Sequence, residues 1–317
     1  MKLIIQIPCY NEEEALPVTV EALPRQVPGF DAVEVLVIDD GSTDRTAEVA
    51  QSLGVNHIVR MNGKQGLARG FMAGLRAAVE HGADVIVNTD ADNQYDARDI
   101  PKLVESIMQG RADIVIGARP IESIRHFSPT KRLLERLGSR VVRALSETDI
   151  RDAPSGFRAM TRDAALRLNV FNAYTYTLET IIQAGRSNLR VVDVPIRVTG
   201  PTRPSRLVKS VAGYVRRSIM TMLSAYLIYR PTQIFGALAV VFLLPATFLA
   251  VRYLILAWFL GQGRGHVQSV IAAAVLAICG VFMVAIAVIA HLQAINRRLL
   301  EELQYLERSR RQGDGSH

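Results

Sequence analysis

The chain has 317 residues, of which 49% are hydrophobic and 21% are charged, and its formal net charge is +7. This length exceeds one small domain and allows an α/β domain of ordinary size with a smaller appendage. The two cysteines, Cys9 and Cys279, exclude a disulfide framework, and neither has neighbours spaced as metal ligands.

Short β-branched runs alternate with helical patterns over the first 120 residues. This alternation predicts the α/β class, with a mainly parallel sheet covered by helices. A Lys- and Arg-rich helix over 130–145 and a last strand over 189–198 complete a catalytic domain that we place at 1–205. The other expected strands lie at 3–7, 33–38, 57–60, 84–88 and 113–117.

Three polar loops follow the first, second and fourth of these strands directly. They are 8–12, 39–44 and 89–92, and in a parallel sheet they converge beyond the carboxyl ends of the strands, where ligands bind. No Gly-x-Gly-x-x-Gly follows the first strand, which excludes a Rossmann dehydrogenase. Gly66, Gly70 and Gly74 lie at helical spacing instead, and we expect them to serve close packing.

Asp90 and Asp92 form the sharpest feature of the third loop. Two carboxylates one residue apart after a buried strand offer hard oxygen ligands that hold Mg²⁺ or Mn²⁺ against a diphosphate. A solvated turn is the alternative for an isolated Asp-x-Asp. The preceding apolar strand and the following Gln94 favour the metal interpretation.

The second loop has two interpretations. Ser42 or Thr43 could cap a helix with Asp44 in its first turn, which leaves Asp39 and Asp40 as an unexplained like-charge pair. A contact to a base or ribose explains one of the two better. In the first loop, Tyr10 and Glu12 could likewise bind a nucleotide or form only a turn.

Two apolar segments, 234–260 and 267–290, are each long enough to span a bilayer. Residues 206–230 precede them as an amphipathic interfacial segment, and a charged cytoplasmic tail follows over 294–317. Basic residues flank this hairpin (231–293), which fits an anionic bilayer surface, whereas the lack of interleaved aromatics argues against nucleic-acid binding. We expect a multi-pass protein of the inner (plasma) membrane with a cytoplasmic catalytic domain. The basic flanks comprise Arg203, Arg206, Lys209, Arg216, Arg217 and Arg230, and then Arg297, Arg298, Arg308, Arg310 and Arg311.

The motifs of the three loops together resemble family 2 glycosyltransferases of GT-A fold, in the branch of dolichyl-phosphate mannose synthases and bacterial undecaprenyl-phosphate glycosyltransferases. The resemblance covers residues 3–210. It rests on Pro8-x-Tyr10-Asn11-Glu12, Asp39-Asp40-Gly41-Ser42-x-Asp44, Asp90-Ala91-Asp92-x-Gln94, Gly117-Ala118-Arg119, Ser155-Gly156-Phe157-Arg158 and Val194-Pro195-Ile196.

The resemblance implies inverting transfer of a hexose from a UDP- or GDP-sugar to a polyprenyl phosphate, with Mg²⁺ or Mn²⁺ as cofactor. It implies catalytic roles for Asp90, Asp92 and Arg119, and a metal site of Asp90, Asp92 and Gln94. The implied nucleotide-sugar contacts are Pro8, Tyr10, Glu12, Asp39, Asp40, Ser42 and Asp90. The implied contacts of the acceptor phosphate are Arg119, Lys131, Arg132 and Arg206.

Two departures from the family pattern matter. Arg203-Pro204-Ser205-Arg206 stands where Gly-x-Ser-Lys is common, and the Gln-x-x-Arg-Trp signature of processive synthases is absent, which disfavours polymerisation. The alternatives are transfer to a diacylglycerol- or ceramide-type lipid, or a non-catalytic membrane scaffold. The sequence leaves the sugar, the base and homo-oligomerisation open.

Overall fold

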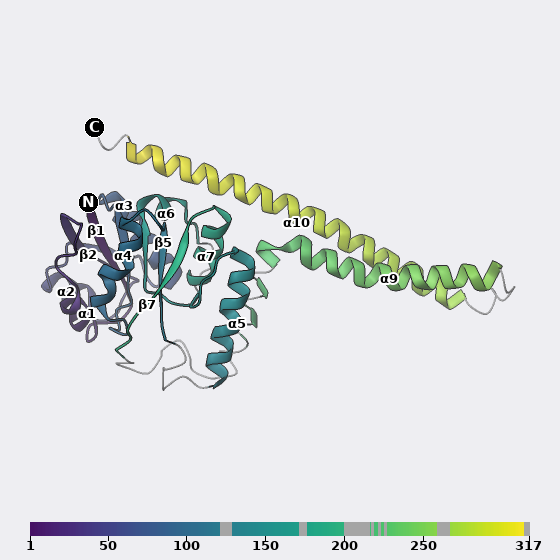
Figure 1. Ribbon diagram of the computed structural model, residues 1–317, viewed down its shortest axis with the longest axis horizontal. Coiled ribbons are helices and arrows are strands. Elements are labelled where there is room, and N and C mark those ends of the chain that lie inside the picture. The colour runs from purple at the N-terminus through teal and green to yellow at the C-terminus, as the bar shows by residue number, and fades with distance from the viewer. Residues whose placement is uncertain are drawn as a thin grey trace. The chain divides into compact units, whose positions relative to one another are not determined.

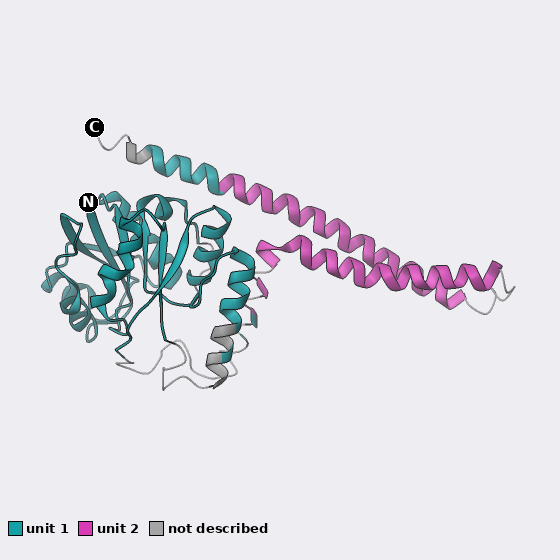
Figure 2. Cartoon of the chain, viewed as in Figure 1, with its two compact units in different colours: residues 1–219, 301–317 teal, residues 220–300 magenta. Residues whose placement is uncertain are grey.

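The computed structural model describes residues 1–120, 129–170, 176–199, 216, 219–220, 223–224, 227–258 and 267–313. The chain forms two compact units (Figure 2), which are 1–219 with 301–317, and 220–300. The first unit contains the predicted N-terminal domain (1–205), residues 206–219 and the end of the tail.

A seven-stranded sheet forms the centre of the first unit (Figure 1), in the order β3-β2-β1-β4-β6-β5-β7. Every strand pair is parallel except the two that involve β6. The predicted mainly parallel α/β fold is therefore confirmed. The strands are β1 (Lys2–Cys9), β2 (Ala32–Asp39), β3 (His57–Arg60), β4 (Val85–Asn88), β5 (Ile114–Ala118), β6 (Arg158–Thr161) and β7 (Val191–Pro195).

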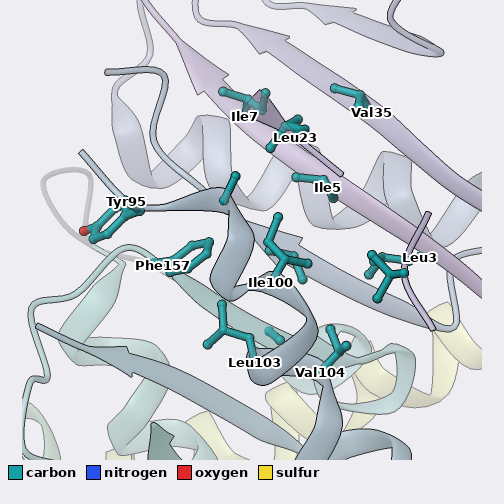
Figure 3. Close-up of a cluster of buried hydrophobic side chains, with 14 of the residues drawn as sticks. Leu3, Ile5, Ile7, Leu23, Val35, Tyr95, Ile100, Leu103, Val104 and Phe157 are labelled. Carbon is teal, nitrogen blue, oxygen red and sulfur yellow. The ribbon is translucent and has the colours of Figure 1, made fainter. Parts of the chain in front are cut away.

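The two faces of the sheet follow from the two-residue period of β1. Leu3, Ile5 and Ile7 point into a buried apolar cluster with side chains of α1 and α4 (Figure 3). On the opposite face, a Cβ at Gly74 of α3 would lie 2.5 Å from the Gln6 amide oxygen. The expected close packing is confirmed at Gly74, because only a glycine lets α3 approach the sheet this closely.

The helices of this unit are mostly short. They are α1 (Leu16–Ala22), α2 (Thr46–Ser52), α3 (Leu67–Glu80), η1 (Ala97–Asp99), α4 (Ile100–Met108), α5 (Pro129–Ser146), α6 (Arg162–Arg167) and α7 (Thr177–Arg186).

The sequence pattern did not predict strand β6. It runs antiparallel between β4 and β5, and Arg158, Ala159 and Met160 are all buried. A four-residue strand that is covered on both faces shows no apolar–polar alternation, and its first residue is an arginine.

The second unit contains α9 (Pro231–Trp258) and most of α10 (Val267–Gly313). Both helices are long and apolar enough to cross a membrane, and the described part of each begins within three residues of the predicted span. The predicted charged tail is helical as far as Gly313, and it continues the second apolar segment as one helix because no glycine or proline interrupts 281–312.

The part of α10 beyond residue 300 belongs to the catalytic unit. Arg308 donates from Nη1 to the carbonyls of Leu166 and Leu168, each at 3.1 Å. Tyr305 donates its hydroxyl to Asp163 at 2.7 Å. Arg308 therefore satisfies carbonyl groups at the end of α6 that have no partner within the helix.

Candidate active site

The three polar loops meet at one edge of the sheet, as the sequence predicts. β1 lies between β2 and β4, with Cys9 opposite Asp39 and Gln6 opposite Asn88. Because these pairings are parallel, the carboxyl ends of the three strands lie at the same edge.

The first two loops are joined by hydrogen bonds. The Asn11 N–H donates to Ser42 Oγ at 2.9 Å, and Thr43 N–H donates to Asn11 Oδ1 at 2.8 Å. The Glu12 N–H donates to Thr46 Oγ1 at 2.8 Å. Asn11 has a φ of 55°, a left-handed conformation that asparagine tolerates better than most residues. Ser42 thus fixes the loop that carries Tyr10 and Glu12.

The helix start expected at Ser42 or Thr43 lies further along the chain. α2 begins at Thr46, whose N–H donates to Asp44 Oδ1 at 3.0 Å. Of the two interpretations of this loop, the one in which Ser42 or Thr43 caps the helix is therefore wrong. Their hydroxyls face Asn11, which leaves Asp44 as the acceptor at the start of the helix.

Asp39 and Asp40 are buried side by side and have different partners. Both oxygens of Asp40 accept backbone N–H groups, from Gln65 at 2.7 Å and Gly66 at 2.8 Å. Asp39 Oδ1 accepts the Ser42 N–H at 2.8 Å, whereas its buried Oδ2 accepts no hydrogen bond among the described residues and lies 3.5 Å from Arg60 Nε in an ion pair. Asp40 thus orders the loop before α3, and Asp39 Oδ2 can still accept a hydrogen bond.

Asp90 and Asp92 follow β4 in a tight turn. Asn93 has a φ of 52°, and the Gln94 N–H donates to Asp92 Oδ1 at 3.2 Å. Burial and the neighbouring charge of Asp92 raise the pKa of Asp90 to about 7. The pair is therefore electrostatically strained, and a divalent cation would offset the repulsion.

The donor set of this turn fits a hard cation. Asp90, Asp92 and the Gln94 side chain supply carboxylate and amide oxygens, the ligands that Mg²⁺ and Mn²⁺ prefer. Within the described ranges, no group of three or more acidic, histidine or cysteine side chains could hold a metal alone. A bound diphosphate would supply the further oxygens that such a cation needs.

Arg119, predicted to bind the acceptor phosphate, is held in a buried ion pair. Its Nε and Nη2 donate to the two oxygens of Asp152 at 2.7 and 2.9 Å, and its side chain is only 14% exposed. The charge of Arg119 also opposes the rise in the pKa of Asp90. The predicted side-chain contacts of Lys131, Arg132 and Arg206 lie outside the described residues.

Several polar residues in the interior below Asp90 have no predicted role. Asn88, Arg158 and Tyr176 are all buried, and Asn88 Nδ2 donates to the Tyr176 hydroxyl at 2.9 Å. Arg158 lies in a quoted motif, but its burial could not be inferred from charge. Lys64 was also missed, and its ammonium lies 3.7 Å from the centre of the Tyr10 ring.

Comparison with known proteins identifies the family. The model of "Glycosyl transferase family 2" matches residues 4–168. Undecaprenyl-phosphate mannosyltransferase of Micrococcus luteus is 32% identical over 206 residues, which cover 62% of this chain and 83% of that protein. Polyprenol monophosphomannose synthase of Mycolicibacterium smegmatis is 28% identical over 209 residues, covering 62% and 77%.

A solved structure supports the fold. Glucosyl-3-phosphoglycerate synthase of Mycobacterium tuberculosis, in complex with Mn²⁺, uridine diphosphate and its product, superposes with a TM-score of 0.54 at 19% identity, covering 71% of this chain and 78% of that one. The chain has the predicted GT-A fold, and it belongs to glycosyl transferase family 2.

Proposed function

We propose that this glycosyltransferase transfers a hexose from a nucleoside diphosphate sugar to a polyprenyl phosphate, with inversion at the anomeric carbon. The observation that carries the proposal is that the Asp90–Asp92 turn and the buried Asp39 carboxylate both follow strands that end at the same edge of the sheet. The named relatives supply the lipid class, because two of them use undecaprenyl or polyprenol phosphate by name.

The first two loops and the Asp90–Asp92 turn form the proposed site for the nucleotide-sugar donor. Asp39 Oδ2 accepts a hydrogen bond from the base or the ribose, and Tyr10, Glu12 and Pro8 contact the nucleotide from the first loop. Ser42 joins the first two loops, and Asp40 holds the loop before α3 next to them. Asp90, Asp92 and Gln94 hold Mg²⁺ or Mn²⁺, and the bound cation neutralises charge on the departing diphosphate.

The acceptor chemistry explains why the site needs no strong base. The second pKa of a phosphate monoester is about 6, so its oxygen is already anionic at neutral pH. That oxygen attacks the anomeric carbon, a new carbon–oxygen bond forms, and the bond to the diphosphate breaks as the nucleoside diphosphate leaves. Arg119, Lys131, Arg132 and Arg206 are the proposed partners of the acceptor phosphate, with Arg119 oriented by Asp152.

The two apolar helices support a location at the bilayer that contains this lipid. We propose a multi-pass protein of the plasma membrane whose catalytic unit and basic flanks face the cytoplasm. A membrane-resident acceptor accounts for the union of a nucleotide-binding domain with an apolar hairpin in one chain.

The function is tested by product formation. Purified full-length protein is incubated with undecaprenyl phosphate, Mn²⁺ and, in turn, GDP-mannose, UDP-glucose and UDP-N-acetylglucosamine, and the lipid fraction is analysed by mass spectrometry. A polyprenyl phosphohexose formed from one donor supports the proposal. Product formed only when diacylglycerol or ceramide replaces the lipid phosphate would reject the acceptor, and no product with any acceptor would reject the function.

A further inference from the structure

The Cα of Gly156 faces the Asp90 carboxylate. A Cβ at Gly156 would lie 3.0 and 3.1 Å from the two oxygens of Asp90 and 3.1 Å from the Tyr176 hydroxyl. Few Cβ atoms are found this close to other atoms, so the carboxylate occupies space that any other residue at 156 would fill. The Asp90 carboxylate therefore packs against the backbone of residue 156, with no side chain between them.

Two side chains hold the backbone of Gly156, one at its N–H and one at its carbonyl. The Gly156 N–H donates to the Tyr95 hydroxyl at 3.1 Å, and Asn88 Nδ2 donates to the Gly156 carbonyl at 2.8 Å. Asn88 is fixed in turn, because Gln6 Nε2 donates to its Oδ1 at 2.8 Å. We call Asn88, Tyr95 and the Gly156 backbone the Gly156 clamp.

Burial makes the Gly156 clamp rigid. Gln6 and Asn88 have no exposed surface, and Tyr95 is 6% exposed. Water cannot replace these hydrogen bonds, and a buried polar group that loses its partner bears the full cost of desolvation.

The hydrogen bonding of Tyr95 leaves its hydroxyl proton to be donated to Asp90. Its ring stacks on Phe157 with centroids 5.1 Å apart and belongs to the apolar cluster, while its hydroxyl points away from the labelled aliphatic side chains (Figure 3). The hydroxyl accepts from Gly156, so its own hydrogen needs an acceptor. Asp90 lies against the same glycine, and hydrogen bonding from Tyr95 opposes the rise in the pKa of Asp90 that burial and Asp92 cause.

We propose that Tyr95 is a positioning residue for Asp90. Through the Gly156 clamp, its hydroxyl fixes the orientation in which Asp90 meets the cation and the nucleotide. This inference deepens the proposed function and rests on the role assigned there to Asp90. It gives residue 95, next to Gln94 but pointing to the interior, a part in the donor site.

The test compares Tyr95→Phe with wild type by calorimetric titration of the full-length protein with UDP and with GDP, each with and without saturating Mn²⁺. The measured quantity is the factor by which Mn²⁺ tightens nucleotide binding. Phenylalanine keeps the ring and its stacking on Phe157, so the melting temperature should stay close to that of wild type. The loss of one hydrogen bond to a charged group should reduce the Mn²⁺ factor about tenfold.

Tyr305→Phe is the matched control, since Tyr305 also donates to an aspartate, Asp163, but on α6. It should keep the wild-type Mn²⁺ factor. Gly156→Ala is the second variant, because its methyl group requires the Asp90 carboxylate to shift by a few tenths of an ångström and should also reduce the factor.

The outcomes separate the inference from the function. A folded Tyr95→Phe protein with the wild-type Mn²⁺ factor would overturn the positioning role, as would an equal loss in Tyr305→Phe. If Tyr95→Phe fails to fold, an undiminished factor in Gly156→Ala overturns the proposal and a reduced one supports it. If wild type shows the Mn²⁺ effect but transfers no sugar, the proposed function fails while the role of Tyr95 is still decided by the titration.

Discussion

The ion pair between Arg119 and Asp152 should be a large contributor to the stability of the catalytic unit. The Asp152 side chain is 1% exposed, and it accepts two hydrogen bonds from the Arg119 guanidinium and one from the Arg119 N–H at 3.0 Å. Asp152→Ala leaves a buried guanidinium without its counter-charge, which costs roughly 3 to 5 kcal/mol. In a domain of this size each kcal/mol lowers the melting temperature by about 2 to 4 °C, so we expect a decrease of about 6 to 20 °C.

The assay is thermal unfolding in detergent followed by circular dichroism. Asp149→Ala serves as the matched control, because Asp149 pairs with Arg143 at 3.4 Å while its side chain is 95% exposed, and such pairs contribute about 0 to 1 kcal/mol. The double variant of Arg119 and Asp152 should lose less than the sum of the single variants. Equal, small shifts in Asp152→Ala and Asp149→Ala would refute the reasoning.

Four further results are expected. Asp92→Asn should abolish transfer in Mn²⁺ without unfolding, because an amide is a poor ligand for a hard cation, and EDTA should stop wild-type turnover until Mn²⁺ or Mg²⁺ is added back; full activity in either experiment contradicts the metal site. Arg119→Ala should raise the Michaelis constant for polyprenyl phosphate about tenfold to a hundredfold while that of the sugar donor stays constant; the reverse pattern would move Arg119 to the donor diphosphate. Gly263→Cys, between the spans, should react with a membrane-impermeant thiol reagent in intact cells, and labelling only after lysis would invert the topology. Arg308→Ala should destabilise the catalytic unit by about 1.5 to 3 kcal/mol in thermal unfolding, because it removes charge-assisted bonds to α6, and an unchanged melting temperature would show that the tail is not docked.

The elements that the sequence predicts well are those with a strong local pattern. β1, β2 and β4 are mainly apolar runs followed at once by polar turns, and this pattern predicts both the strands and the edge at which their loops meet. The two apolar segments are longer, and the structure has helices at both. The sequence did not predict β6, because this strand is short and is buried on both faces. Its antiparallel position in the sheet depends on partner strands more than 40 residues away.

The site was predictable where one residue type carries the chemistry. Asp90 and Asp92 follow a buried strand, so their position needed no tertiary information. The roles of Asp39 and Asp40 could not be distinguished from the sequence. They differ because the loop before α3 donates two N–H groups to Asp40, and this contact depends on the tertiary structure. Likewise, the pairing of Arg119 with Asp152 joins residues 33 positions apart.

The polar residues beneath Asp90 show how this site obtains its precision. Gln6 and Asn88 point to the α3 side of the sheet at positions where apolar side chains would contribute more to stability, since buried amides must be desolvated. Their hydrogen bonds offset part of that cost, and they fix a backbone unit that an apolar side chain could not hold. For a reaction whose nucleophile is already ionised, the rate depends on how accurately the donor and the acceptor are placed. Gln6 and Asn88 lie on strands, and their hydrogen bonds below the Asp90 carboxylate supply that accuracy from a rigid part of the fold.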